Sequence, residues 1–293
     1  VLFFQSILPA DYAFASWIIG GGLLVTIAVI TGFSVGHWLL FVLFITHALV
    51  GAVELGTDGW IQNITGNMLS SEQGKILFVW TSACMFGLRF CANWMEKTLN
   101  IKPITLLFIC SLLACLGLNM VSGATAFTGA IIALTVYSFG KTFFWPTMLA
   151  VASDRFPRSG AIAISIMGGI GMMSSGLLGS PGLGYAKDRF SGEALNEASP
   201  ALYTEYKSET PSNWLFLDEV NGLDAKKLSA IKEKESPNED EMKVAEASIE
   251  GDRRTLKADS FIPAAMAVIY LLLMVYFKSI GGYKTVAIEE KKE

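Results

Sequence analysis

Four ionisable residues, Glu54, Asp58, Arg89 and Lys141, interrupt long apolar stretches of the sequence. A charged side chain at the centre of a lipid bilayer costs at least ~2.5 kcal/mol, so each of them needs a physical reason to be there. Glu54 and Asp58 are four residues apart and would therefore share one face of a helix. Two carboxylates on one face in a low dielectric cannot both ionise cheaply. We therefore expect this pair to take up and release a proton.

Polar and aromatic residues extend the two candidate helix faces. Helical spacing adds Gln62 to the face of the carboxylates, and Lys141 has Tyr137 and Trp145 four residues to either side. Trp145 could stack on a sugar ring. We expect Lys141 to pair with one of the two carboxylates. The candidate lining of a solute cavity is therefore Glu54, Asp58, Gln62, Tyr137, Lys141 and Trp145.

Each of these residues also has an interpretation without transport chemistry. Lys141 could form a buried ion pair that only fixes two helices, and Asp58 could lie solvated at the membrane surface. Arg89 could be a helix-end anchor that binds carbonyl groups or Glu96. Trp145 could belong to the aromatic belt at the membrane interface, and His47 could be an interior histidine whose nitrogens are satisfied.

The stretches that carry these residues have the composition of a membrane protein. Of 293 residues, 52% are hydrophobic and only 16% are charged, and the mean hydropathy is +0.48. Soluble domains carry about 25% charged residues. A helix needs roughly 20 apolar residues to cross a bilayer, and in lipid its backbone must satisfy its own hydrogen bonds. We predict an all-α transmembrane bundle with spans near Ala13–Phe33, His37–Ile61, Lys75–Trp94, Pro103–Val121, Thr125–Ala152, Ala161–Gly184 and Phe261–Phe277.

One long segment, Ser191–Ser260, breaks the apolar pattern. It holds sixteen acidic and nine basic residues. Within it, Ala225–Glu250 is rich in helix-forming residues but has only a weak apolar stripe. We expect a solvated, partly mobile helical excursion between the last two membrane helices.

The short loops indicate how the bundle is oriented. Lysine and arginine concentrate in cytoplasmic loops. Here they collect after alternate spans, which predicts a cytoplasmic C-terminus in a plasma or inner membrane, with the acidic insertion outside. The basic residues are Lys97, Lys102, Arg155, Arg158, Lys278, Lys284, Lys291 and Lys292.

Three motifs resemble the second six-helix half of the major facilitator superfamily. The stretch from Gly87 to Lys97 resembles a degenerate copy of that family's cytoplasmic loop motif, and residues 143–188 are similar to its helices ten and eleven. Residues 54–60, of the form E-x-G-T-x-x-W, are similar to helix seven of the fucose–glucose–galactose permease branch. Two departures stand out: the Ser34–Gly36 link is short, and the insertion is long.

The resemblance implies a division of the chain into four segments. Residues 1–36 would hold an apolar N-terminal segment and helix six, and 37–190 helices seven to eleven. Residues 191–260 would be the extracytoplasmic insertion, and 261–293 the last helix and its tail. The chain begins at Val1 within an apolar run, so we expect an N-terminal half of the same transporter to precede it.

The motifs of common enzyme sites are absent from the sequence. It has only two histidines, ten residues apart, and therefore no H-E-x-x-H zinc site, and it has no G-x-S-x-G elbow. We expect no cofactor, no metal and no nucleic-acid partner. The prediction is proton-coupled uptake of a small polar solute such as a sugar. The alternatives are an exporter, an organic-anion exchanger, or a membrane sensor or scaffold.

Overall fold

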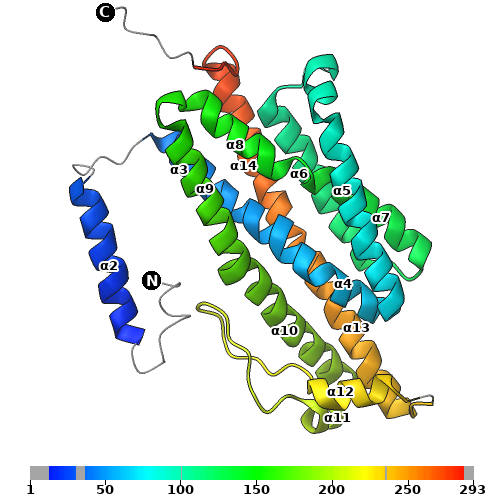
Figure 1. Ribbon diagram of the computed structural model, residues 1–293. Coiled ribbons are helices and arrows are strands. Elements are labelled where there is room, and N and C mark those ends of the chain that lie inside the picture. Colours follow the sequence, from blue (N-terminus) through cyan, green and yellow to red (C-terminus); the bar gives the residue numbers. More distant parts are fainter. Residues whose placement is uncertain (1–12, 31–36, 100, 235, 287–293) are drawn as a thin grey trace, which may run out of the picture. The chain divides into compact units, whose positions relative to one another are not determined.

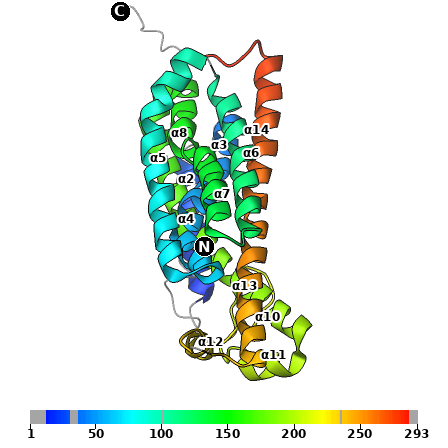
Figure 2. The same ribbon diagram turned by 90° about the vertical axis from the view of Figure 1, so that its right-hand side faces the viewer.

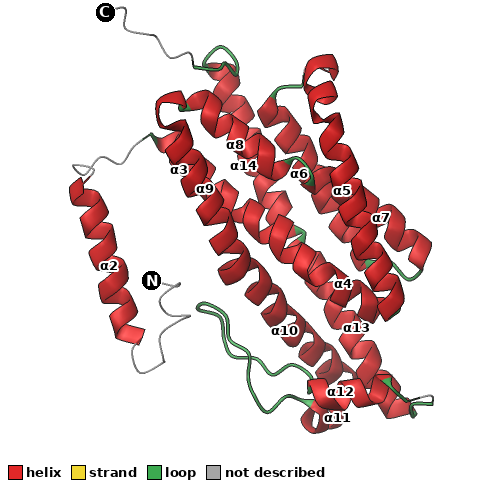
Figure 3. Ribbon diagram, viewed as in Figure 1, coloured by secondary structure: helices red, strands yellow, loops and turns green. Residues whose placement is uncertain are grey.

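The computed structural model describes residues 13–30, 37–99, 101–234 and 236–286, although the side chains of 92–99 and of several residues in 13–30 are not described. Most of the described residues are helical, and they form no strand, apart from two isolated bridges, Lys207–Leu223 and Ser212–Val220 (Figure 3). The chain divides into two compact units, residues 1–45 and 46–293.

The predicted membrane spans after the first correspond to six helical stretches of the described chain. Each is long and apolar enough to cross a bilayer. They are Trp38–Met68, Ser71–Cys91, Pro103–Ser122, Phe127–Arg155, Pro157–Ala198 and Glu239–Ser279. The expected all-α transmembrane bundle is thus confirmed. In the first predicted span, the structure describes helix α2, Ala13–Ile30, in which Phe14–Leu23 is a shorter apolar segment; residues 31–33 lie outside the described part.

The stretches are built from shorter elements that join end to end (Figure 1). They are α3 (Trp38–Val50), η2 (Gly51–Gly56), α4 (Thr57–Met68), α5 (Ser71–Leu99), α6 (Pro103–Ser122), α7 (Phe127–Lys141), α8 (Phe144–Arg155), η3 (Pro157–Ser159), α9 (Gly160–Ser174), η4 (Ser175–Gly179), α10 (Ser180–Ala198), α11 (Pro200–Tyr206), α12 (Ala225–Lys232), α13 (Glu239–Asp259) and α14 (Phe261–Ser279).

The span that contains Lys141 is broken in its middle. Helix α7 ends at Lys141 and α8 begins at Phe144. Pro146, in the first turn of α8, has no backbone N–H and its ring clashes with the carbonyl four residues earlier. The break therefore places Lys141 at the last residue of α7, where the helix dipole favours a cation.

Two π-helical segments, η2 and η4, lie against each other inside the bundle. Glycines permit the close approach of η2 to both α9 and η4: a Cβ on Gly51 would come 2.0 Å from the carbonyl oxygen of Gly171 on α9, and one on Gly56 would come 2.9 Å from the Cα of Gly179 on η4. Small residues let membrane helices approach closely. Not every glycine of the α9–η4 span packs against a neighbour, because a Cβ on Gly168 or Gly176 would meet nothing within 4 Å.

The insertion continues the last two spans beyond the rest of the bundle. Helix α10 runs on without interruption to Ala198, and α13 leads directly into α14 at Ser260. Figure 2 shows α13 and α14 following one another, with α11 and α12 at the far end. Over Ala225–Glu250, where we expected a helical excursion, the structure has two separate helices, α12 and the first part of α13. Asn238 caps α13 through a reciprocal capping box with Glu241.

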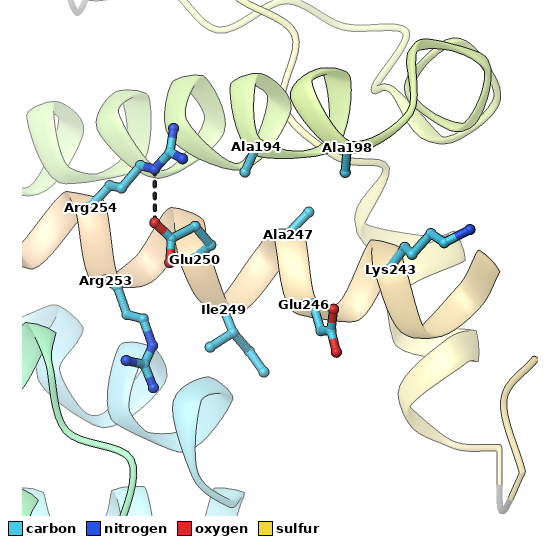
Figure 4. Close-up of a pocket in the computed structure, with 9 residues that line it drawn as sticks. All are labelled: Ala194, Ala198, Lys243, Glu246, Ala247, Ile249, Glu250, Arg253 and Arg254. Carbon is cyan, nitrogen blue, oxygen red and sulfur yellow. Dashed lines mark hydrogen bonds and ion pairs between the residues drawn. The ribbon is translucent and has the colours of Figure 1, made fainter. Parts of the chain in front are cut away.

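The insertion has a hydrophobic core of its own. We call this set the insertion core; its buried residues are Ala194, Leu195, Leu202, Ile231, Val244 and Ala247. Figure 4 shows the α10–α13 contact, in which Ala194 and Ala198 of α10 face α13. On α13, Arg254 donates to Glu250 over 2.9 Å. Small side chains at this contact let the two helices pack closely although both are polar overall.

Candidate functional site

The amino group of Lys141 is ion-paired with the carboxylate of Asp58, so the predicted carboxylate partner exists. The two residues come from the end of α7 and the start of α4. The Lys141 side chain is completely buried, whereas that of Asp58 is 22% exposed. The lysine nitrogen also lies 5.3 Å from the centre of the Tyr137 ring, close enough for a cation–π attraction. The pair fixes α7 to α4 inside the bundle.

Glu54 makes a second, looser ion pair. It lies in the π-helical segment η2 and is 2% exposed. Its Oε1 is 3.5 Å from a guanidinium nitrogen of Arg89 on α5, while its Oε2 has no hydrogen-bond partner among the described residues. The Arg89 side chain is half exposed. Arg89 thus contacts a buried carboxylate of another span; the side chain of Glu96, its other expected partner, lies outside the described part.

The π-helical turn explains why the neighbouring carboxylates have different partners. A π-helix has a wider turn than an α-helix and often occurs at functional sites. Here it separates Glu54, which faces Arg89, from Asp58, which faces Lys141. These four side chains carry two formal charges of each sign and link three membrane spans. We call them the charge cluster.

Two hydrogen bonds are made by residues beside the charge cluster. One of them involves a carboxylate that the sequence did not indicate. The Tyr137 hydroxyl donates to the carbonyl of Val53 over 2.8 Å. The Thr57 hydroxyl donates to Asp259 over 2.6 Å, although the residues are 202 positions apart. Asp259 is the last residue of α13 and is buried. Asp259 ends a polar segment in which carboxylates are expected to be solvated, so its position in the sequence does not indicate that it is buried.

Trp145 is an interior residue that packs on His47. Their rings meet edge to face, with centroids 4.6 Å apart, and the indole also lies against Gly171. His47 is fully buried, and neither ring nitrogen has a hydrogen-bond partner among the described residues. The interpretation of His47 as a histidine with both ring nitrogens hydrogen-bonded is therefore not supported.

Gln62 does not join the charge cluster. It is exposed in the middle of α4, one turn beyond Asp58, and lines a separate cavity of about 910 Å³ beside the insertion. Two further tryptophans, Trp60 and Trp80, make hydrogen bonds to neighbouring spans. Trp60 donates to Ser180 over 2.8 Å, and Trp80 donates to Thr135 over 2.9 Å. In the described part of the chain, no three histidine, cysteine, aspartate or glutamate residues gather as a metal site.

Comparison with known proteins places this arrangement in a known fold. The chain is similar to the crystal structure of a bacterial homologue of the human lysosomal transporter Spinster, in an inward-facing and occupied conformation. The TM-score is 0.60 at 15% sequence identity, over 82% of this chain and 50% of that one. The chain has the fold of a major-facilitator half. The expected likeness to the fucose–glucose–galactose branch gains no support from this similarity.

The chain matches only part of the solved structure. It spans about half the length of the solved structure it matches. No protein-family model matches it, and neither does any curated protein. In this fold the charge cluster joins the span of α3, η2 and α4 to those of α5 and α7–α8. The chain is thus a multi-pass membrane protein with buried ion pairs between its spans.

Proposed function

We propose that the chain is the C-terminal half of a secondary active transporter that takes up a small polar solute together with protons. The observation that carries the proposal is the charge cluster, Glu54, Asp58, Arg89 and Lys141. Ionisable groups inside membrane spans are rare and commonly mark solute and proton pathways. The solute would bind near the middle of the bilayer, and access would alternate as the two halves rock.

Glu54 has the features of a coupling carboxylate. It is buried, one oxygen faces Arg89 and the other has no hydrogen-bond partner in the described part. Proton binding to Glu54 would remove the attraction to Arg89 and so loosen α5 from η2. Asp58 would stay ionised because Lys141 pairs with it. One carboxylate would then carry the proton while the other holds the helices together.

The balance of charge in the cluster favours a neutral solute. Two carboxylates and two cations leave no net formal charge, so the group offers hydrogen bonds without a surplus that would select an anion. Tyr137 and Trp145 add aromatic surface beside it, which suits a sugar ring. The second wall of the cavity would come from the N-terminal half. In the cell membrane the basic loops would face the cytoplasm, with the C-terminus inside and the insertion outside.

Uptake by the full-length protein in proteoliposomes tests this proposal. A panel of neutral sugars and small organic anions would be offered with and without an inward proton gradient. We expect gradient-driven uptake of a neutral sugar that is lost in Glu54→Gln and retained in Glu72→Gln, which changes an exposed glutamate in the first turn of α5. Gradient-independent uptake, or equal uptake by both variants, would contradict coupling at Glu54. Efflux or anion exchange in place of sugar uptake would favour the exporter or the exchanger.

The insertion supports a second candidate function, that of a membrane sensor or scaffold. A segment with its own core could bind a partner protein independently of solute movement. In that case, replacing the 208–222 loop by a short glycine–serine linker would abolish function while Glu54→Gln would leave it intact. For a transporter we expect the reverse result.

A further inference from the structure

A large polar cavity lies where the end of α4 meets the insertion, apart from the charge cluster. Its volume of about 910 Å³ is within the range of small-molecule sites. The side chains that line it come from α4, α10, α12 and α13 and from the turn before α5. Its polar lining residues are Gln62, Asn63, Asn67, Ser70, Ser71, Lys187, Ser229 and Lys232.

One of the two lysines in this cavity is neutralised. Lys187 on α10 lies 3.0 Å from the carboxylate of Asp252 and donates to the side-chain oxygen of Asn63 over 3.1 Å. Asp252 is completely buried on α13. Its charge therefore balances that of Lys187, and the pair holds α10, α13 and α4 together at the wall of the cavity.

The other lysine has no such counter-charge. The amino group of Lys232 donates to the side-chain oxygen of Asn67, and no carboxylate of the described residues lies within ion-pair distance. Asn67 is itself oriented, because its NH₂ group donates to Ser248 over 3.0 Å and also to Asp252. An amide oxygen accepts a hydrogen bond but carries no full charge. The cavity thus has one surplus positive charge at a defined position.

The uncharged polar side chains that line the cavity indicate which groups a negatively charged ligand would carry besides its charge. Amide side chains both donate and accept hydrogen bonds, and serine hydroxyls do the same. Such groups suit a ligand with several hydroxyls, whereas an apolar ligand would leave them unpaired at a cost of about 1–3 kcal/mol each. A single surplus cation matches a single carboxylate. Lys187, Ser229 and Lys232 also line an adjoining cavity of about 200 Å³.

We infer that this cavity binds a small hydroxylated carboxylate of the sugar-acid class, with Lys232 holding the carboxylate and the amides of α4 holding hydroxyl groups. The site differs in charge from the charge cluster, which is balanced. Its occupancy needs no transport, so the inference does not depend on the proposed function. Gln62 belongs to this site.

Binding measured by titration calorimetry on the full-length protein in detergent tests the inference, with D-gluconate, D-glucose and inorganic phosphate as probes. We expect D-gluconate to bind at least tenfold more tightly than D-glucose. Lys232→Gln should remove that difference, and Lys232→Arg should retain most of it. Lys226→Gln is the matched control, because Lys226 is exposed on the same helix and does not line the cavity.

Three results would overturn the inference: equal affinity for gluconate and glucose, equal loss in Lys232→Gln and Lys226→Gln, or binding of phosphate without gluconate. A folding defect in Lys232→Gln would appear as a lower melting temperature than in Lys226→Gln. In that event Gln62→Ala, which changes an exposed side chain, decides the question. It should weaken gluconate and glucose alike if hydroxyl groups contact α4, and an unchanged affinity for both would overturn the assignment. Loss of uptake in Glu54→Gln with normal gluconate binding would separate this site from the transport pathway.

Discussion

Lys141 and Asp58 form an ion pair between the last residue of α7 and the first turn of α4, and each residue adjoins an interrupted helix. The break after Lys141 and the π-helical segment before Thr57 both lie inside membrane spans. Broken helices at this depth are tolerated where they are buried in protein or line a cavity. The pair therefore connects the two least regular points of these spans.

Removing Lys141 should destabilise the protein more than removing the whole pair. In Lys141→Gln, Asp58 is left without its counter-charge, and breaking a buried pair costs about 3 kcal/mol. The exposed fraction of Asp58 reduces this to about 2 kcal/mol, because solvent screens the charge. Lys141→Gln combined with Asp58→Asn should recover part of the loss. Thermal unfolding in detergent measures both, and additive losses in the double variant would contradict the pairing.

The contact between η2 and α9 should depend on Gly51. Gly51→Ala places a Cβ against the carbonyl oxygen of Gly171, and such overpacking costs about 1–3 kcal/mol. Gly168→Ala is the matched control, because a Cβ there meets nothing within 4 Å and alanine favours a helix more than glycine does. We expect a lower melting temperature for Gly51→Ala alone. Equal melting temperatures would show that η2 and α9 do not approach this closely in the membrane.

The spans and the Lys141 pair were predictable because they depend on local composition. Apolar runs of about 20 residues define membrane helices whatever their neighbours. Only a few carboxylates lie inside the apolar stretches, so Lys141 had few possible partners. Its partner could not be chosen between Glu54 and Asp58 from spacing. That choice depends on the π-helical turn of η2, which packs against η4 and which no local pattern in the sequence indicates.

The insertion and Gln62 were harder to foresee. The apolar stripe of α13 looked weak because its buried face consists largely of small residues, such as Ala247 and Gly251, which score low on hydropathy yet pack closely. Gln62 does share a helix with Asp58, as expected. It nevertheless lies one turn further along α4, where it lines a different cavity beside the insertion. The periodicity of a sequence shows which residues share a helix face, but it does not show which neighbouring element each of them meets along the helix axis.

The insertion core should stabilise the α10–α13 pair. Leu195 is completely buried there, and Leu195→Ala should cost about 3 kcal/mol through lost burial and the cavity left behind. Asn196→Ala, one residue further along and exposed, should cost little. Limited proteolysis reports the difference, because local opening of this pair exposes the backbone of α10 and α13 to cleavage. Equal cleavage rates in the two variants would mean that α10 and α13 are held by the membrane spans alone.

The affinity of the cavity for a carboxylate should begin to fall at a lower pH than it would if Lys232 had the usual pKa of a lysine. Partial burial, and then the neighbouring charge of Lys187, lower the pKa of Lys232 below its usual value of 10.5. The carboxylate needs the protonated amine, so affinity should fall as the pH rises through this lowered pKa. Asp252 remains paired with Lys187 on the other wall. In Lys232→Arg the guanidinium stays charged throughout, and gluconate affinity measured up to pH 10 should then be flat; the same decline in both proteins would mean that another group controls it.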